Sequence, residues 1–220
     1  MSKTVLFVLF LAFPTVTVAD FLDDFLKHAS DNPSCSEEFK KILACAQPHF
    51  ELIREVYPKL NSISTLYNIG LMNKGLQLVE NVTICLGEEK RDFKCTLPKI
   101  VVTSLDYAQY IGKKVYGDAF HCFINVNAIE TFQICAAENQ QPRNIHENVL
   151  NDESAYKKIA QPIVECMAKK MYETPSCTID RIVELYHAGE AGLDLYYSLL
   201  KFVKGVQVER SFSDNNYCRA

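Results

Sequence analysis

Residues 179–204, IDRIVELYHAGEAGLDLYYSLLKFVK, carry the clearest structural signal in the chain. Apolar side chains recur in this stretch every three or four residues, which is the repeat of an α-helix with one buried face. Thr178, directly before the stretch, can cap its first turn. We therefore predict a long amphipathic helix whose apolar stripe consists of Ile182, Leu185, Tyr186, Leu193, Tyr196, Leu199, Leu200 and Val203.

The same spacing recurs along the rest of the chain, and the alternation typical of strands is almost absent. Pro48 interrupts the helix expected at residues 34–56, and Gly117 and Pro175 each stop a helix. Asp152 or Ser154 can cap the helix before the last one, and Pro162 predicts a kink in it. We predict an all-α fold, a single compact disulfide-linked bundle of about six or seven helices. The expected helices cover residues 21–26, 34–56, 62–85, 98–116, 119–137, 152–174 and 179–204.

The beginning of the chain has the composition of a secretory signal peptide. Lys3 precedes an uncharged apolar run, Thr4–Val18, which ends in small residues. A membrane anchor is the alternative, but a spanning helix needs roughly 20 apolar residues, and this run is shorter and contains Pro14. We assign residues 1–19 to a signal peptide and residues 20–220 to a single helical, disulfide-rich domain that is secreted to the extracellular space.

Charge and hydropathy exclude two classes of partner. The formal net charge is −4, and the sequence has no basic stripe and no interleaving of basic and aromatic residues, so we expect no nucleic acid partner. No stretch after the signal peptide is long and apolar enough for a membrane span. The expected partner is an unknown extracellular macromolecule or a small hydrophobic ligand.

The chain has nine cysteines, all of them after the predicted signal peptide. In an oxidising compartment such cysteines predict a disulfide framework. A zinc site is the alternative, but there is no C-x-x-C, and the neighbours His121 and Cys122 have no partners at ligand spacing. We therefore expect no metal. Since nine is odd, one cysteine stays free or links two chains.

Helix geometry limits which cysteines can pair. Cysteines ten or more residues apart on one helix lie about 15 Å apart, whereas a disulfide needs Cα atoms within roughly 7 Å. Cys122 and Cys135 should therefore not pair with each other. Antiparallel neighbours come level at equal distances from their turn. Turns near residues 60 and 115 and the loop at residues 138–151 therefore favour the pairs Cys35–Cys85, Cys95–Cys135 and Cys122–Cys166. Any two of the remaining cysteines could form a fourth disulfide, and we favour Cys45–Cys177, with Cys218 as the free thiol.

One glycosylation sequon is present, Asn81-Val82-Thr83. The similar Asn32-Pro33-Ser34 is excluded by its proline. We predict a glycan at Asn81 if this site, which falls near the end of an expected helix, is exposed.

The chain has no recognisable catalytic motif. It lacks a G-x-S-x-G elbow, an H-E-x-x-H zinc motif, a Walker loop and a dinucleotide fingerprint. His187, between Glu184 and Glu190, could be a partnered base, but a solvated pair on a helix surface is the favoured interpretation. We therefore expect no enzyme, no catalytic residues and no cofactor.

Two glycines and a set of aromatic residues suggest features of helix packing. Gly189 and Gly192 lie inside the last expected helix, where they indicate close approach of a neighbouring helix or a kink. Aromatics at helical spacing usually belong to the core, although they could line a cavity for an apolar ligand. These aromatics are Tyr107, Tyr110, Tyr116, Phe120, Phe123, Phe132, Tyr186, Tyr196 and Tyr197.

Part of the sequence resembles a known family. The stretches that carry the resemblance surround the cysteines of the central and C-terminal part and are Phe120–Phe123, Phe132–Cys135, Glu165–Met167, Cys177 and Ile179–Leu185. They are similar to the insect 27 kDa haemolymph glycoprotein family. The resemblance implies an extracellular helical glycoprotein of haemolymph or a glandular secretion, without an established activity.

Three functional hypotheses follow. The first is a secreted non-enzymatic glycoprotein that acts by binding a macromolecule, which predicts an exposed apolar patch. The second is a carrier of a small hydrophobic ligand, which predicts an apolar cavity in the helical bundle. The third is an enzyme of an unrecognised class, which predicts a cleft with a strongly perturbed ionisable group.

Overall fold

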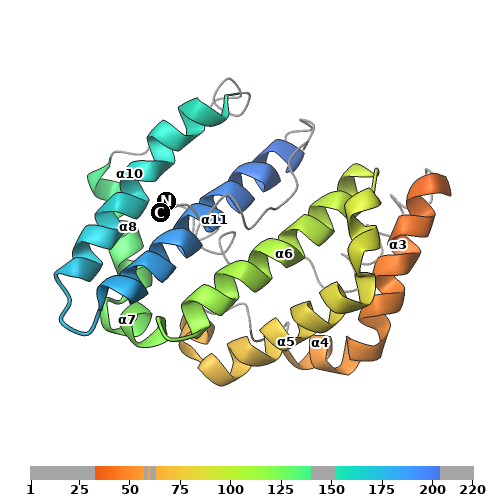
Figure 1. Cartoon of the computed structure of the whole chain (residues 1–220), viewed down its shortest axis with the longest axis horizontal. Helices are drawn as coiled ribbons and strands as arrows, with labels where there is room; N and C mark the ends of the chain where they lie inside the picture. Colours follow the sequence, from red (N-terminus) through yellow and green to blue (C-terminus); the bar gives the residue numbers. More distant parts are fainter. Residues whose placement is uncertain (1–32, 57–58, 60–62, 140–151, 204–220) are drawn as a thin grey trace.

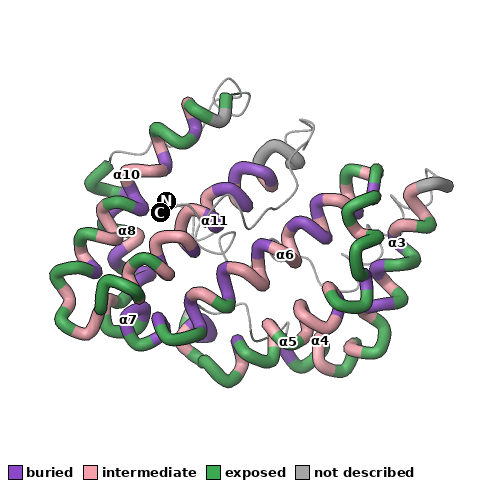
Figure 2. The backbone as a smooth tube through the Cα atoms, in the orientation of Figure 1, coloured by how far each residue is buried: buried purple, intermediate pink, exposed green. Residues whose placement is uncertain are grey.

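Two long helices, α6 (Thr96–Tyr116) and α11 (Ile179–Val203), pack against each other at the centre of the molecule (Figure 1). The computed structural model describes residues 33–56, 59, 63–139 and 152–203. Buried positions recur along both helices (Figure 2), as their apolar periodicity requires. The largest hydrophobic cluster of the described residues includes Tyr107, Ile111 and Val115 of α6 and Leu185, Ala188, Ala191 and Leu195 of α11.

The N-terminal helices cover one side of α6. In chain order they are α3 (Pro33–Ala46), α4 (Phe50–Val56) and α5 (Ile69–Leu86), joined by the short 3-10 helices Gln47–His49 and Ile63–Tyr67. α5 packs on α6, and α3 and α4 pack on α5. A second hydrophobic cluster fills this side, and its buried members are Ile42, Cys45, Val82, Leu86, Phe93 and Val102.

The remaining helices cover the α11 side. α7 (Phe120–Asn125) and α8 (Ala128–Glu138) follow α6 in the chain, and α10 (Glu153–Tyr172) precedes α11. α10 packs between α11 and α8, so that α8, α10, α11, α6, α5 and α3 lie in spatial succession (Figure 1). None of the described helices has the length and apolar character needed to cross a membrane.

The predicted fold class, an all-α disulfide-linked bundle, is confirmed, and the last helix begins where the sequence indicates. The Asp152 carboxylate caps α10 by accepting the backbone N–H groups of Ser154 and Ala155 at 2.9 and 3.2 Å. Pro162 lies inside α10. The expected helix 21–26 and the signal peptide lie outside the described residues.

Three of the expected helices contain a break. In residues 34–56 the break is the expected interruption at Pro48, where a 3-10 turn separates α3 from α4. Residues 62–85 begin with the 3-10 helix Ile63–Tyr67, and α5 starts only at Ile69. Residues 119–137 are interrupted at Asn127, which adopts a left-handed conformation with φ 47°. Asn tolerates this conformation better than most residues. These breaks give eight α-helices in the described part of the chain, rather than the expected six or seven.

Four disulfides join the helices, and each half of the chain holds two. Cys35–Cys95 links α3 to the residue directly before α6, and Cys45–Cys85 links α3 to α5. The Cα–Cα distance is 5.6 Å in both pairs. Cys122–Cys177 and Cys135–Cys166 link α7 and α8 to α10 and the turn after it, at 4.8 and 5.7 Å. In both halves one disulfide is nested within the other. No described disulfide links the two halves, which are joined by α6 and by packing.

The predicted pairings Cys35–Cys85, Cys95–Cys135, Cys122–Cys166 and Cys45–Cys177 are wrong, although all eight cysteines are paired. The excluded pair Cys122–Cys135 is absent. The paired cysteines of the N-terminal half do lie at equal distances from a common midpoint, but this midpoint differs from the predicted one. Cys35–Cys95 and Cys45–Cys85, with sequence separations of 60 and 40, are both centred on Thr65 rather than on the expected turn at residue 60. Cys95 and Cys135 do not meet because α6 packs on α5 and α11 instead of α8.

Candidate ligand-binding cavity

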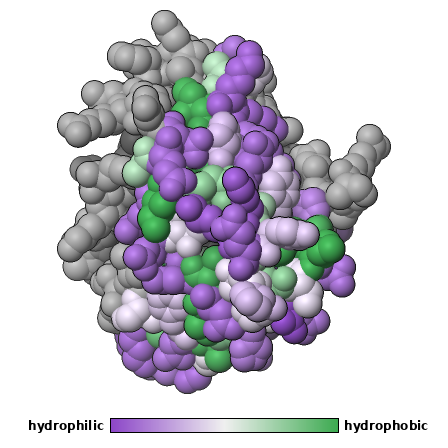
Figure 3. Space-filling model, turned by 90° about the vertical axis from the view of Figure 1, so that its left-hand side faces the viewer, coloured by the Kyte–Doolittle hydropathy of each residue, from purple (hydrophilic) through white to green (hydrophobic). Residues whose placement is uncertain are grey.

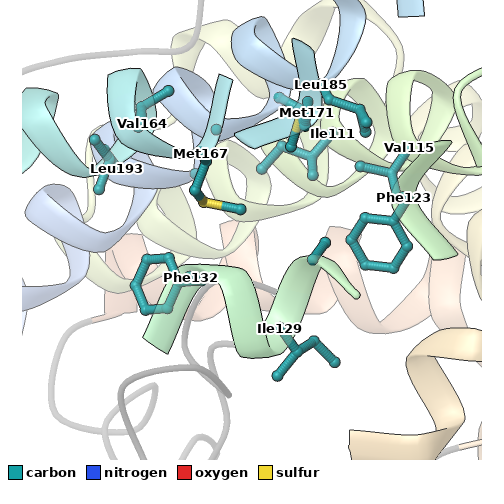
Figure 4. A pocket seen from close by; sticks show the side chains of 14 residues that line it. Ile111, Val115, Phe123, Ile129, Phe132, Val164, Met167, Met171, Leu185 and Leu193 are labelled. Carbon is teal, nitrogen blue, oxygen red and sulfur yellow. The ribbon is translucent and has the colours of Figure 1, made fainter. Parts of the chain in front are cut away.

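An apolar cavity of about 90 Å³ lies among α6, α8, α10 and α11. Every lining side chain is a hydrocarbon, a thioether or the hydrogen of glycine, so the lining side chains offer a ligand no hydrogen-bond donor and only the weak thioether acceptors. Figure 4 shows Phe132 on α8 below Met167 of α10 and Leu193 of α11, with Ile129 at the lower edge of the view. The lining residues are Ile111, Val115, Phe123, Ala128, Ile129, Phe132, Val164, Met167, Met171, Leu185, Ala188, Gly189, Gly192 and Leu193.

Small residues account for the space. Ala128, Ala188, Gly189 and Gly192 line the cavity with no side chain larger than a methyl group. Gly189 also brings α10 and α11 together, because a Cβ at this position would lie 3.2 Å from Cγ1 of Val164. The close helix approach expected at Gly189 is therefore confirmed. The larger side chains around these positions cannot collapse into the gap without leaving their own contacts.

The cavity has a buried end and a more accessible end. Met171 and Leu185 are buried, with 3% and 5% of their surface exposed. Phe132, Met167 and Leu193 are only partly buried, so we place the mouth of the cavity at these three residues. In Figure 3, which views the left-hand end of the molecule in Figure 1, apolar side chains form separate groups among hydrophilic ones.

The two disulfides of the C-terminal half fix the walls of the cavity. Cys122, beside the lining residue Phe123, is bonded to Cys177. Cys135 and Cys166 tie α8 to α10, and their cluster includes Phe132 and Met167 at the mouth. The disulfides therefore hold the helices that carry these residues at a fixed separation.

Of the nine candidate aromatics, Phe123 and Phe132 line the cavity. Tyr107, Tyr116, Phe120 and Tyr197 are buried in the core instead, and Tyr110, Tyr186 and Tyr196 are partly buried. Burial raises the pKa of Tyr116 well above the ordinary tyrosine value, and its hydroxyl donates a hydrogen bond to the Leu66 carbonyl at 3.1 Å. Most of these aromatics therefore stabilise the bundle.

A polar cluster lies between α10 and α11, outside the cavity lining. The Gln161 amide donates to the Tyr186 hydroxyl at 2.6 Å, and burial, followed by the nearby Glu190 carboxylate, raises the pKa of Tyr186. His187 Nδ1 lies 3.5 Å from a Glu190 carboxylate oxygen, and its side chain is only 12% exposed. The expectation of a solvated histidine is therefore wrong. Glu184 instead forms an ion pair with Lys114 at 2.7 Å.

One group of potential metal ligands occurs in the described part of the chain, and it consists of Cys135, Glu138 and Cys166. The two sulfurs are joined in a disulfide, so neither offers the thiolate that binds zinc. The Glu138 carboxylate lies 3.4 Å from the Lys170 ammonium, which accounts for its position.

The sequon Asn81-Val82-Thr83 lies within α5. Asn81 is partly buried, and the Thr83 hydroxyl is buried with no hydrogen-bond partner among the described residues. Glycosylation at Asn81 stays a prediction. Cys218, the expected free thiol, lies outside the described residues.

Replacing Thr83 with valine should leave the free energy of unfolding unchanged or raise it by up to about 1 kcal/mol, because the change removes an unsatisfied buried hydroxyl and keeps the shape. Thr83→Ser keeps the hydroxyl, loses a methyl group and should lower this free energy by about 0.8 kcal/mol. Urea denaturation of protein made without glycosylation would compare the two. If both variants lowered the free energy of unfolding equally, the Thr83 hydroxyl would have a hydrogen-bond partner. Thr83→Val also removes the sequon, whereas Thr83→Ser keeps it.

Comparisons with known proteins give no relative for this chain: no family model, no curated protein and no solved structure matches it.

Proposed function

We propose that this protein is a secreted, non-enzymatic extracellular protein that binds a small, uncharged hydrophobic ligand in the cavity among α6, α8, α10 and α11. The observation that carries the proposal is the lining, in which none of the side chains can form a strong hydrogen bond. Such a site favours hydrocarbon over water and over any polar molecule. The four disulfides are typical of proteins that function in an oxidising compartment. The resemblance to haemolymph glycoproteins agrees with a role in a body fluid or glandular secretion.

The size of the cavity restricts the ligand. Its volume of about 90 Å³ is smaller than the ~150 Å³ of an engineered apolar cavity that binds benzene. A single small ring or a short hydrocarbon chain therefore fits best. Met167 and Met171 line the space, and methionine side chains are flexible enough to adjust it to a ligand of this size.

Binding in the cavity is better supported than the two other hypotheses. The large apolar side chains with the highest exposure in the described chain are Ile84, Tyr172 and Ile179, which are 71%, 73% and 68% exposed. Single exposed apolar side chains are normal on a protein surface, so these residues alone do not define a docking face. The polar cluster around His187 does not line the cavity, so it does not place a proton-transfer group beside a bound ligand.

Benzene should bind at least tenfold more tightly than pyridine at neutral pH. The two molecules have nearly the same shape, but the pyridine nitrogen would lose its hydrogen bond to water and find no donor among the lining side chains. Isothermal titration calorimetry with the purified full chain measures both affinities. Absence of benzene binding, or equal affinity for pyridine, would overturn the proposed function.

A matched pair of variants places the binding site. Leu185 lines the cavity and Leu86 lies in the other hydrophobic cluster, and the two are similarly buried, with 5% and 6% exposure. Leu185→Phe should fill the cavity and weaken benzene binding at least tenfold, because the added ring atoms take the space of the ligand. Leu86→Phe should leave benzene binding unchanged, although it overpacks the core.

A further inference from the structure

Met167 differs from the other methionines of the described chain in its accessibility. The chain has four methionines, of which Met1 lies outside the described residues. Met72 and Met171 are buried, with 8% and 3% exposure. Met167 is only partly buried, and it lines the cavity beside Phe132 at the mouth. In Figure 4 its thioether extends from α10 toward α8, the helix that carries Phe132.

We propose that Met167 is an oxidation site through which peroxides switch off ligand binding, an inference that rests on the proposed function of the cavity. Hydrogen peroxide transfers one oxygen atom to the Met167 sulfur, so that the thioether becomes a sulfoxide and the peroxide is reduced to water. No thiol or metal is needed, because peroxide is itself the two-electron oxidant.

The chemistry of the lining makes this change disruptive. A sulfoxide oxygen is a strong hydrogen-bond acceptor, and no lining side chain is a donor to satisfy it. If the oxygen stays in the cavity, it is buried without a partner and disfavours an apolar neighbour. If it turns toward water, the side chain leaves its place at the mouth, and the ligand loses the contacts of the thioether. Both outcomes weaken the binding of an apolar ligand.

The geometry also predicts which methionine reacts first. Peroxide reaches Met167 at the mouth, whereas Met171 lies at the buried end of the same cavity and Met72 is buried in the main hydrophobic cluster. A ligand in the cavity should cover the Met167 sulfur and slow its oxidation. Oxidation and binding are therefore expected to oppose each other.

The test combines peptide mass spectrometry with calorimetry on the full chain. Limited treatment with hydrogen peroxide should convert Met167 to the sulfoxide at least tenfold faster than Met72 or Met171, and saturating benzene should slow this conversion. The oxidised protein should bind benzene at least tenfold more weakly than the untreated protein. Oxidation of Met171 or Met72 at the same rate as Met167 would overturn the inference.

Two variants separate the role of Met167 from general damage. In Met167→Leu, benzene affinity before and after peroxide should be the same, because the oxidisable sulfur is gone. In Met171→Leu, peroxide should still reduce the affinity at least tenfold. If untreated protein binds benzene and Met167 sulfoxide leaves the affinity intact, the inference is wrong and the proposed function stands. If untreated protein does not bind benzene at all, both are wrong.

Discussion

Replacement of Cys122 and Cys177 together by alanine is expected to lower the free energy of unfolding by about 4 kcal/mol. The disulfide closes a segment with a sequence separation of 55, and a loop of this length loses that much chain entropy when it is cross-linked in the unfolded state. Cys122 is also completely buried, so the variant loses sulfur contacts in the core. Urea denaturation under non-reducing conditions measures the change.

The control variant replaces the two cysteines of a predicted but unobserved pair, Cys122 and Cys166. Because Cys122 and Cys166 belong to different disulfides, Cys122→Ala/Cys166→Ala breaks both of them and should cost roughly twice as much. Thiol titration in denaturant should find two more thiols than in the unmodified protein, those of Cys135 and Cys177. The Cys122→Ala/Cys177→Ala variant should add none. A linked Cys122–Cys166 peptide in a non-reducing digest of the unmodified protein would contradict the structure.

Replacement of Gly112 by alanine is expected to lower the free energy of unfolding by about 1–3 kcal/mol. Gly112 is buried where α6 crosses α5. A Cβ at this position would lie 2.0 Å from Cδ2 of Leu76 and 2.9 Å from its Cγ, so the whole Leu76 side chain would have to move. This cost exceeds the gain in helix propensity on replacing glycine.

Gly75 provides a matched control within α5. A Cβ there would meet Cγ1 of Val56 at 3.8 Å, which is ordinary van der Waals contact. Gly75→Ala should therefore raise the free energy of unfolding by about 0.5–1 kcal/mol, because alanine favours the helix and loses less conformational freedom on folding. The opposite signs of the two substitutions, read by thermal denaturation, test the packing of α5 on α6. In a Leu76→Ala background, Gly112→Ala should no longer lower the free energy of unfolding, because the shorter side chain leaves room for the added methyl group, although Leu76→Ala itself destabilises the protein. If Gly112→Ala stabilised the protein as Gly75→Ala does, the close approach would be wrong.

The features that depend on neighbours in sequence were predictable. The last helix, the cap at Asp152 and the stop at Gly117 follow from apolar spacing and from local backbone chemistry. The break at Asn127 was missed because asparagine is only moderately disposed to the left-handed conformation, so its presence within a helical pattern is a weak signal.

The disulfide pattern contained a signal that was not used. Cys35 and Cys45 have the same spacing as Cys85 and Cys95, so two antiparallel segments can form both disulfides at once. Cys85 lies in the last turn of α5, and Cys95 directly precedes α6. In the second half, Cys122–Cys177 and Cys135–Cys166 likewise have nearly the same midpoint in sequence, with sequence separations of 55 and 31. A requirement that two disulfides share one centre would have favoured the observed pairs over Cys35–Cys85 and Cys95–Cys135, which are centred on residues 60 and 115.

By itself, the sequence determined that the protein is helical, because apolar periodicity and capping residues act over one or two turns. It also identified Gly189 as a point of close helix approach. Only the tertiary structure decided which cysteines meet, which of the nine candidate aromatics face a cavity, and that Gly112 must accommodate Leu76. These properties depend on which helices become neighbours, and that choice is made by the packing of whole apolar faces distant in sequence. The cavity and the accessibility of Met167 are consequences of the same packing.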